Sequence, residues 1–181
     1  MDTAETKLPS AEFYAELTQC LPHMRSFARY LCRRDDLADD LVQDAVVRAS
    51  MAAHQFIPGT NFKAWIFTIM HNLFVDQRRR KGRRREGAML PLDHAEALAA
   101  PAEQAELMGA REVLNALQAI SPERRAALLA VAVEGFSYAE AAAMLGVPAG
   151  TLMSRVARGR DDLRALLDDA GRRRMIRVIE T

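Results

Sequence analysis

The chain has 181 residues, of which 50% are hydrophobic and 27% charged, and a formal net charge of +1. This length allows one ordinary domain or two small ones, and the composition is typical of a protein that can bury a core and stay soluble. No apolar run is long enough to span a bilayer, and the first residues lack the basic and apolar segments of a secretory signal. We therefore expect a cytoplasmic protein with no membrane association.

The sequence offers no constellation for catalysis or for a cofactor. Its two cysteines, Cys20 and Cys32, fit reduced thiols in a core, and its four histidines are scattered without metal-ligand spacing. Neither a glycine-rich phosphate loop nor a nucleophile elbow is present. We therefore expect a protein that is not an enzyme and that carries no cofactor or metal.

Apolar residues recur at helical spacing almost throughout, and the alternation typical of strands is absent, so the sequence predicts an all-α fold. The first helix is expected over residues 11–32, with Pro22 splitting or kinking it. The second helix is expected from Asp36 to Ala53 and sorts into two faces. Its apolar stripe comprises Ala38, Leu41, Val42, Ala45, Val46 and Ala49.

The opposite face of this second helix is acidic. It carries Asp36, Asp39, Asp40, Gln43 and Asp44, and like charges four residues apart weaken an isolated helix slightly. Carboxylates in a first turn interact favourably with the helix dipole, so one interpretation is a solvated acidic face. The other interpretation is a docking face for a basic surface of a partner.

A loop over residues 54–61 precedes a helix expected from Phe62 to about Arg80. The predicted buried stripe of this helix comprises Phe62, Trp65, Ile66, Ile69 and Leu73. Asn72 follows Trp65 by one heptad, at the edge of the stripe. Its amide can bridge to a neighbouring backbone or read the edge of an extruded base.

The same helix leads into a concentrated block of positive charge. Seven of the eight residues from Arg78 to Arg85 are arginine or lysine, so the remainder of the chain carries a net charge of −6. A helix with a core-facing stripe and a basic end indicates a folded scaffold that holds a polyanion.

Helical periodicity weakens from Glu86 to Met108, a stretch with two prolines and many alanines. We interpret it as a flexible linker with at most a short helical piece. Two small helical domains are therefore predicted, over residues 11–85 and 109–167, followed by a basic tail over residues 168–181.

The second unit has the capping residues and the turn that are typical of a helix-turn-helix. Ser121 is placed to cap a helix that ends at a glycine, and Ser137 with Glu140 forms a capping box for the next helix. Gly146 marks a tight turn before a last helix over residues 149–167.

One side of this last helix carries four polar residues at spacings of three, four and seven: Thr151, Ser154, Arg155 and Arg158. In a helix-turn-helix, the N-terminal half of the second helix enters the DNA major groove. Arginine there pairs with guanine edges or phosphates, and serine and threonine suit either. The alternative is an ordinary helical hairpin with a polar outer face.

Three stretches resemble, in this order, motifs of the bacterial extracytoplasmic-function (ECF) RNA polymerase sigma factors: DLADDLVQDAVVRA, FKAWIFTIMHNLFVDQRRRKGRR and GFSYAEAAAMLGVPAGTLMSRVARGR. The first two are similar to region 2 of that family and the third to region 4. The resemblance covers residues 11–85 and 109–167. Within the family, PGTNFKAWIFTIMHN and VEGFSYAEAA are most similar to the EcfG-like general-stress branch.

The resemblance implies a subunit that binds core RNA polymerase and directs promoter recognition and transcription initiation for a stress regulon. Region 4 would bind the β flap, and the acidic helix of region 2 would dock on the β′ clamp helices of the polymerase. The residues implied are Asp39, Asp40, Gln43 and Asp44 for polymerase, Asn72 for a base flipped from the −10 element, Arg78, Arg79, Arg80 and Lys81 for phosphates beside it, and Thr151, Ser154, Arg155 and Arg158 for the −35 element.

Two further expectations come with the resemblance. The position of Met153 is often lysine or arginine in the family, so we expect a shifted −35 preference. An anti-sigma factor is expected to cover the polymerase-binding faces. In the EcfG-like branch it would be a small helical protein, released by a phosphorylated response regulator that carries a sigma-like domain.

Two other interpretations stay open on the residues alone. The first is a stand-alone helix-turn-helix transcription regulator, which would bind duplex operators without docking on polymerase. The second is a helical RNA-binding protein that uses Arg78–Arg85 as its whole site. This second interpretation leaves the helix-turn-helix unexplained.

Overall fold

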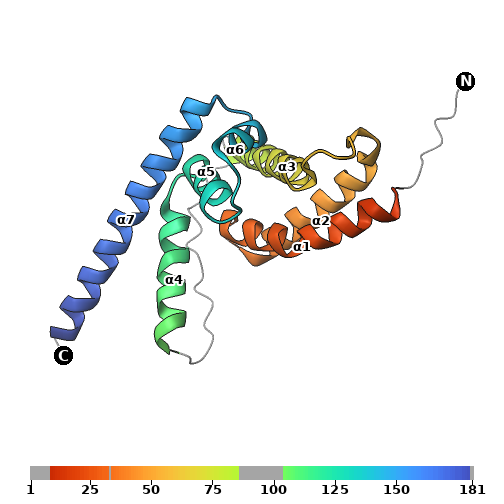
Figure 1. Cartoon of the computed structure of the whole chain (residues 1–181). Coiled ribbons are helices and arrows are strands. Elements are labelled where there is room, and N and C mark those ends of the chain that lie inside the picture. The colour runs from red at the N-terminus through yellow and green to blue at the C-terminus, as the bar shows by residue number, and fades with distance from the viewer. Residues whose placement is uncertain (1–8, 33, 86–103, 180–181) are drawn as a thin grey trace, which may run out of the picture.

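The computed structural model describes residues 9–32, 34–85 and 104–179, and over these ranges every regular element is helical (Figure 1). In chain order the elements are α1 (Ala11–Leu31), α2 (Asp35–Met51), a 3-10 turn η1 (Ala53–Gln55), α3 (Phe62–Arg85), α4 (Gln104–Ala119), α5 (Pro122–Ala132), α6 (Tyr138–Leu145) and α7 (Ala149–Ile179). The all-α prediction is confirmed. Among the described residues, no helix is both long and apolar enough to cross a membrane.

The N-terminal unit is a bundle of α1, α2 and α3. Ser10 caps α1 by accepting a hydrogen bond from the Phe13 N–H, at 3.2 Å. Pro22 does not split this helix, because α1 is a single element that runs through it to Leu31. Helix α2 turns its small and branched side chains inward, and the buried ones are Ala38, Leu41, Val42, Ala45 and Ala49.

The burial of α3 differs from the single stripe that its sequence predicts. Phe62 and Ile66 are buried as expected, whereas Trp65, Ile69 and Leu73 are only partly buried. The buried side chains also include Phe67, Met70 and Phe74. The reason is that α3 has neighbours on several sides, since it packs on α1 and α2 and also on α6 of the C-terminal unit.

The C-terminal unit comprises α4 to α7, and its predicted caps are present. Ser121 accepts a hydrogen bond from the Arg124 N–H, and Ser137 and Glu140 form a complete capping box. Gly146 ends α6 at a φ of +62°, a left-handed conformation that suits glycine. The turn that it makes leads directly into α7, which completes the helix-turn-helix.

Several helix ends lie outside the predicted bounds, among them the end of α3, which is at Arg85 instead of about Arg80. Helix α4 begins at Gln104, inside the stretch that was predicted to be linker; residues 86–103 of that stretch lie outside the described residues. Helix α7 continues to Ile179 instead of ending at 167, since residues 168–179 contain no proline and a single glycine.

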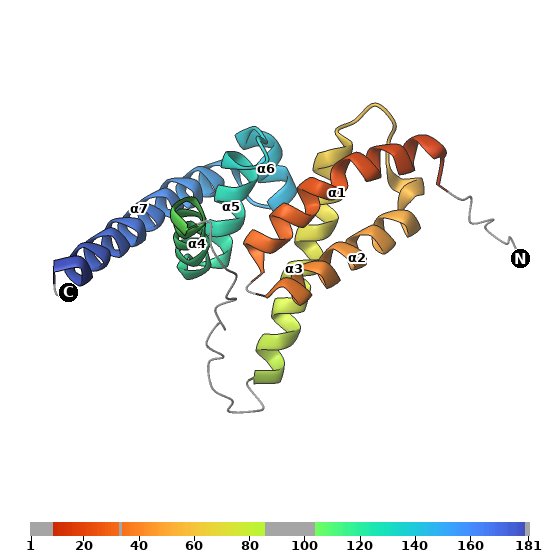
Figure 2. The same ribbon diagram turned by 90° about the horizontal axis from the view of Figure 1, so that it is seen from below.

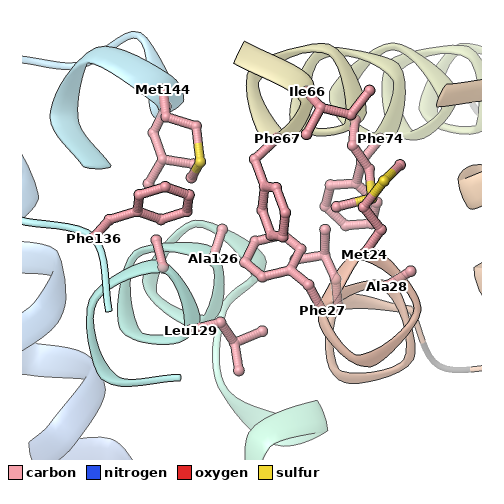
Figure 3. Close-up of a cluster of buried hydrophobic side chains, with 14 of the residues drawn as sticks. Met24, Phe27, Ala28, Ile66, Phe67, Phe74, Ala126, Leu129, Phe136 and Met144 are labelled. Carbon is pink, nitrogen blue, oxygen red and sulfur yellow. The ribbon is translucent and has the colours of Figure 1, made fainter. Parts of the chain in front are cut away.

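The two units pack against each other around one continuous core. In both views of the molecule, α5 and α6 lie beside α1 and α3, while α7 extends away from the N-terminal unit (Figures 1 and 2). The Phe67 ring of α3 packs edge-to-face on Phe27 of α1 and on Phe136 of the C-terminal unit, with centroid distances of 5.2 Å and 5.5 Å (Figure 3). This contact between the units was not predicted.

Candidate nucleic-acid and protein interfaces

The outer face of α2 is acidic and fully accessible. The four residues that the sequence singled out, Asp39, Asp40, Gln43 and Asp44, are all exposed. Asp44 accepts a hydrogen bond from the Gln77 side chain of α3 at 3.2 Å, which fixes the orientation of one carboxylate. Because the opposite side of α2 is buried in the core, this face must lie on the surface.

Sequence reasoning missed that this acidic face continues into an apolar one. Val47 and Met51 follow Gln43 and Val47 by four residues each, and they are 59% and 67% exposed. Ile57, in the loop after η1, is 69% exposed. Exposed apolar side chains that extend a charged face are typical of a protein interface. The signal was present in the sequence as apolar residues outside the buried stripe.

A shallow open groove separates α1 from α2. It is lined by Arg25, Arg29, Asp39, Val42 and Gln43, with a volume of about 390 Å³. Two of these residues also belong to the acidic face, so the acidic face borders on two arginines of α1. A partner that covers both helices would therefore meet a surface of mixed sign.

Asn72 lies on the exposed side of α3. The helix under it is held by an aromatic cluster, in which Trp65 packs on Phe13, Phe56 and Phe62 at centroid distances of 6.0, 5.4 and 5.7 Å. Trp65 thus has the scaffold position that the sequence predicts. Phe56 ties the loop before α3 to the same cluster, which fixes that loop beside the helix.

The described side chains at the basic end of α3 are exposed, and one of these arginines is already engaged. Arg78 forms an ion pair with Glu123 of α5, at 3.0 Å, and its guanidinium lies over the Phe74 ring. Arg79 and Arg80 are exposed, and the side chain of Lys81 lies outside the described ones. Arg78 therefore touches both units, while its two successors face solvent.

The four predicted residues of α7 are divided between two environments. Ser154 and Arg158 are exposed, together with Met153, which is 58% exposed. Thr151 and Arg155 are half-buried, and Leu152 and Val156 are fully buried in the core. The outer face of the helix is therefore centred on Met153, Ser154 and Arg158, with Thr151 and Arg155 at its half-buried edge.

His71 of α3 is a largely buried histidine with an altered pKa. Burial, together with the positive charge of Arg155, lowers the pKa of His71 to about 4, while Glu123 opposes the shift. The Nδ1 atom of His71 is buried without a hydrogen-bond partner. The positive charge of Arg155 thus helps burial to keep this histidine neutral.

Comparison with known proteins identifies both units. The Sigma-70 region 2 family matches residues 17–84, and the Sigma-70 region 4 family matches residues 110–163. The chain is 40% identical over 152 residues to the ECF RNA polymerase sigma factor EcfG of Rhodopseudomonas palustris, a match that covers 84% of this chain and 83% of that protein.

Two solved structures are similar over most of the chain. The sigma factor RpoE of Bartonella quintana, in complex with the anti-sigma factor NepR, has a TM-score of 0.79 at 36% identity and covers 88% of this chain and 98% of that one. CnrH, in complex with the cytosolic domain of CnrY, has a TM-score of 0.64 at 29% identity and covers 87% and 88%. The chain therefore belongs to the ECF RNA polymerase sigma factors, which bind core RNA polymerase and direct it to promoters, with α1–α3 as region 2 and α4–α7 as region 4.

Proposed function

We propose that the exposed face of α2 docks this sigma factor on the β′ clamp helices of core polymerase. Asp39, Asp40, Gln43 and Asp44 would supply the polar contacts, with Val47 and Met51 extending the contact along the helix. Exposure of all these side chains over a buried opposite face supports this proposal. Like charges along one helix face are tolerated where a basic partner neutralises them. Region 4 would bind the β flap.

Asn72 would hold a base flipped from the −10 element, and the basic end of α3 would follow the adjacent phosphates through Arg78, Arg79, Arg80 and Lys81. Extruding a base costs a few kcal/mol, so the pocket must offer hydrogen bonds to its edge. The accessible amide of Asn72 on a rigidly packed helix supports this role. Each phosphate neutralised in a duplex would add about −0.9 to the slope of log affinity against log salt.

The −35 element would be read by the outer face of α7. Ser154 and Arg158 are presented directly, and Thr151 and Arg155 would join them at the edge of the contact. Met153 places an apolar side chain on this face. Such a side chain would recognise DNA through contact with the methyl group of a thymine. Its exposure of 58% supports that contribution.

Control by an anti-sigma factor in the cytoplasm would complete the function. RpoE of Bartonella quintana and CnrH were each solved with an anti-sigma partner, NepR and CnrY. By likeness to EcfG we propose that a small helical anti-sigma protein covers the polymerase-binding faces and that the regulon is one of general stress.

Run-off transcription on genomic fragments with purified core polymerase tests the function directly. Specific transcripts that need both core enzyme and this protein are expected. A gel shift of a specific duplex by the protein alone, with no effect of core enzyme and no transcripts, would instead support a stand-alone helix-turn-helix regulator.

The role of Asn72 has its own test. Asn72→Ala is expected to lower transcription at least about tenfold, since the flipped base loses its hydrogen bonds. Binding to core polymerase, measured by pull-down, should be unchanged. Loss of core binding in this variant would assign Asn72 a structural role.

A further inference from the structure

The contact between the two regions is built around one buried carboxylate. Glu134 lies in the turn after α5, and its side chain is 1% exposed. Its Oε2 is 2.9 Å from Nζ of Lys63 at the start of α3 and 3.2 Å from Nδ1 of His23 of α1. Neither contact has the alignment of a hydrogen bond, so both are ion pairs, the one with His23 only when that ring is protonated. A buried carboxylate without a cation is costly, so Lys63 and Glu134 need each other.

Lys63 joins the two regions in further ways. Its ammonium group also donates a hydrogen bond to the backbone carbonyl of Glu134, at 3.0 Å. It lies 5.6 Å from the ring centroid of Phe67 in region 2 and 5.3 Å from that of Phe136 in region 4. Phe136 is itself buried, with Met144 on one side and Phe67 on the other (Figure 3). One lysine of region 2 is thus held by a charge, a carbonyl and a ring of region 4.

Region 4 also completes the C-terminal end of α1. The last carbonyls of a helix have no partner within the helix. Here Arg125, which is 2% exposed, donates to the Leu31 carbonyl at 2.9 Å. Gln118 donates to the carbonyls of Tyr30 and Cys32 at 3.1 Å and 2.7 Å. These three carbonyls therefore receive donors from α4 and α5 instead of from water.

The same contact occupies part of the candidate DNA surfaces. Arg78, at the basic end of α3, is paired with Glu123 of region 4. Arg155, in the recognition helix, is half-buried and lies near His71 of region 2. Arg78 is thus engaged by a carboxylate of region 4, although its side chain stays 47% exposed, and Arg155 is only partly accessible.

We propose that region 4 is latched onto region 2 in the free protein by the Lys63–Glu134 pair, and that this closed state withholds Arg78 and Arg155 from promoter DNA until the regions separate. The latch itself rests only on the contacts above; its effect on DNA rests on the proposed function. Promoter DNA and polymerase would then bind the separated state preferentially, and their binding would have to offset the latch.

Reversal of the lysine tests the latch. Lys63→Glu places two carboxylates at the buried site and should separate the regions. The substitution is compatible with region 2 itself, because a carboxylate in the first turn of α3 is favourable for the helix. Small-angle X-ray scattering of the free protein should show a larger radius of gyration. Affinity for a fluorescent duplex, cut from a promoter that the holoenzyme transcribes, should rise roughly tenfold if the open fraction rises from about a tenth to nearly all.

Two further variants make the test specific. Lys63→Glu combined with Glu134→Lys restores opposite charges and should return both the radius and the affinity toward those of the original protein. Arg48→Glu makes the same change of charge on α2, which packs on α1 and α3, and should alter neither. If Lys63→Glu is folded by circular dichroism and has an unchanged radius, the latch does not exist.

A covalent bridge tests the same proposal without reversing a charge. The Asn61 amide and a Glu140 carboxylate oxygen of α6 are 2.8 Å apart across the contact. With both residues changed to cysteine and joined by a short bismaleimide, duplex binding should fall at least about tenfold relative to the unbridged variant. Equal binding by bridged and unbridged protein would overturn the masking. Transcription by the unbridged holoenzyme reports on the proposed function separately.

Discussion

Region 2 and region 4 each present one functional helix, and the two helices differ in how freely they do so. The proposed polymerase-docking face of α2 is exposed along its whole length. The proposed recognition helix α7 exposes Ser154 and Arg158, whereas Arg155 is half-buried. The comparison shows that the pattern of a helix predicts what its face can bind, while the neighbouring region decides whether the face is available.

The largest effect is expected for the exposed face of α2. Asp40→Arg with Asp44→Arg should reduce binding to core polymerase at least about 100-fold, because two charges of the docking face are reversed. A pull-down with purified core enzyme measures it, and circular dichroism should show an unchanged fold. The matched control is Glu12→Arg with Glu16→Arg, an exposed pair four residues apart on α1. Equal loss in this control would mean that net charge, not the α2 face, governs binding.

Two neighbouring arginines of α5 test how much the contact between the regions stabilises the protein. Arg125→Ala should lower the free energy of unfolding by about 3 kcal/mol, since it leaves buried carbonyls of both regions without a donor. Arg124→Ala removes a half-exposed ion pair with Asp162 and should cost less than about 1 kcal/mol. Urea unfolding followed by circular dichroism compares the two. Similar losses would mean that the capping of α1 by region 4 contributes little.

The recognition helix offers a comparison within one face. In the holoenzyme, Arg155→Ala and Arg158→Ala should each weaken −35 discrimination by about 1–3 kcal/mol if the contact is bidentate. For the free protein binding a duplex, Arg158→Ala should have the larger effect, because Arg155 is half-covered. Competition binding with a series of −35 variants gives both numbers. Unchanged discrimination in the Arg155→Ala holoenzyme would remove that residue from the reading surface.

The last comparison concerns pH and the buried histidine of α3, His71. The pKa of His71 is about 4 in the folded protein against 6.5 for a free histidine, so folding favours the neutral ring. The groups that face it from region 4 are Arg155 of α7 and Glu123 of α5. The stability that the neutral ring contributes is therefore complete above pH 6.5 and is lost as the pH falls toward 4, by up to about 3 kcal/mol.

This pH dependence has a matched pair of variants. Unfolding of the His71→Gln protein should depend less steeply on pH between 6.5 and 4, whereas His54→Gln, an exposed histidine before α3, should leave the profile unchanged. Identical profiles for both variants would mean that the burial of His71 does not persist in solution.

Local rules were sufficient for much of the fold. The capping box at Ser137, the glycine turn at Gly146 and the apolar stripe of α2 depend on neighbours within a few residues, so they could be predicted from the sequence. The exposure of the acidic face followed from the same stripe. The length of α7 was underestimated, because helix ends without a proline or a capping residue carry a weak signal.

The contact between the regions could not be predicted in this way. Phe67 and Phe136 are far apart in the sequence, and a helical period on α3 does not tell how many neighbours the helix has. Arginine and glutamate are usually exposed, and only the positions of α1 and α3 explain why Arg125 and Glu134 are buried. The same is true of Arg155, since its place on α7 follows from the helical spacing but its half-burial does not.

The interface between the two regions, called here the seam, joins parts of a single polypeptide. This lowers the affinity that the two regions need in order to stay together. Covalently connected partners meet at an effective concentration on the order of 1 mM. A seam that would hold two separate proteins with a dissociation constant of only about 0.1 mM would still close roughly nine chains in ten. Such a seam is kept shut by connection more than by affinity, so a partner that binds the separated regions only moderately better can open it.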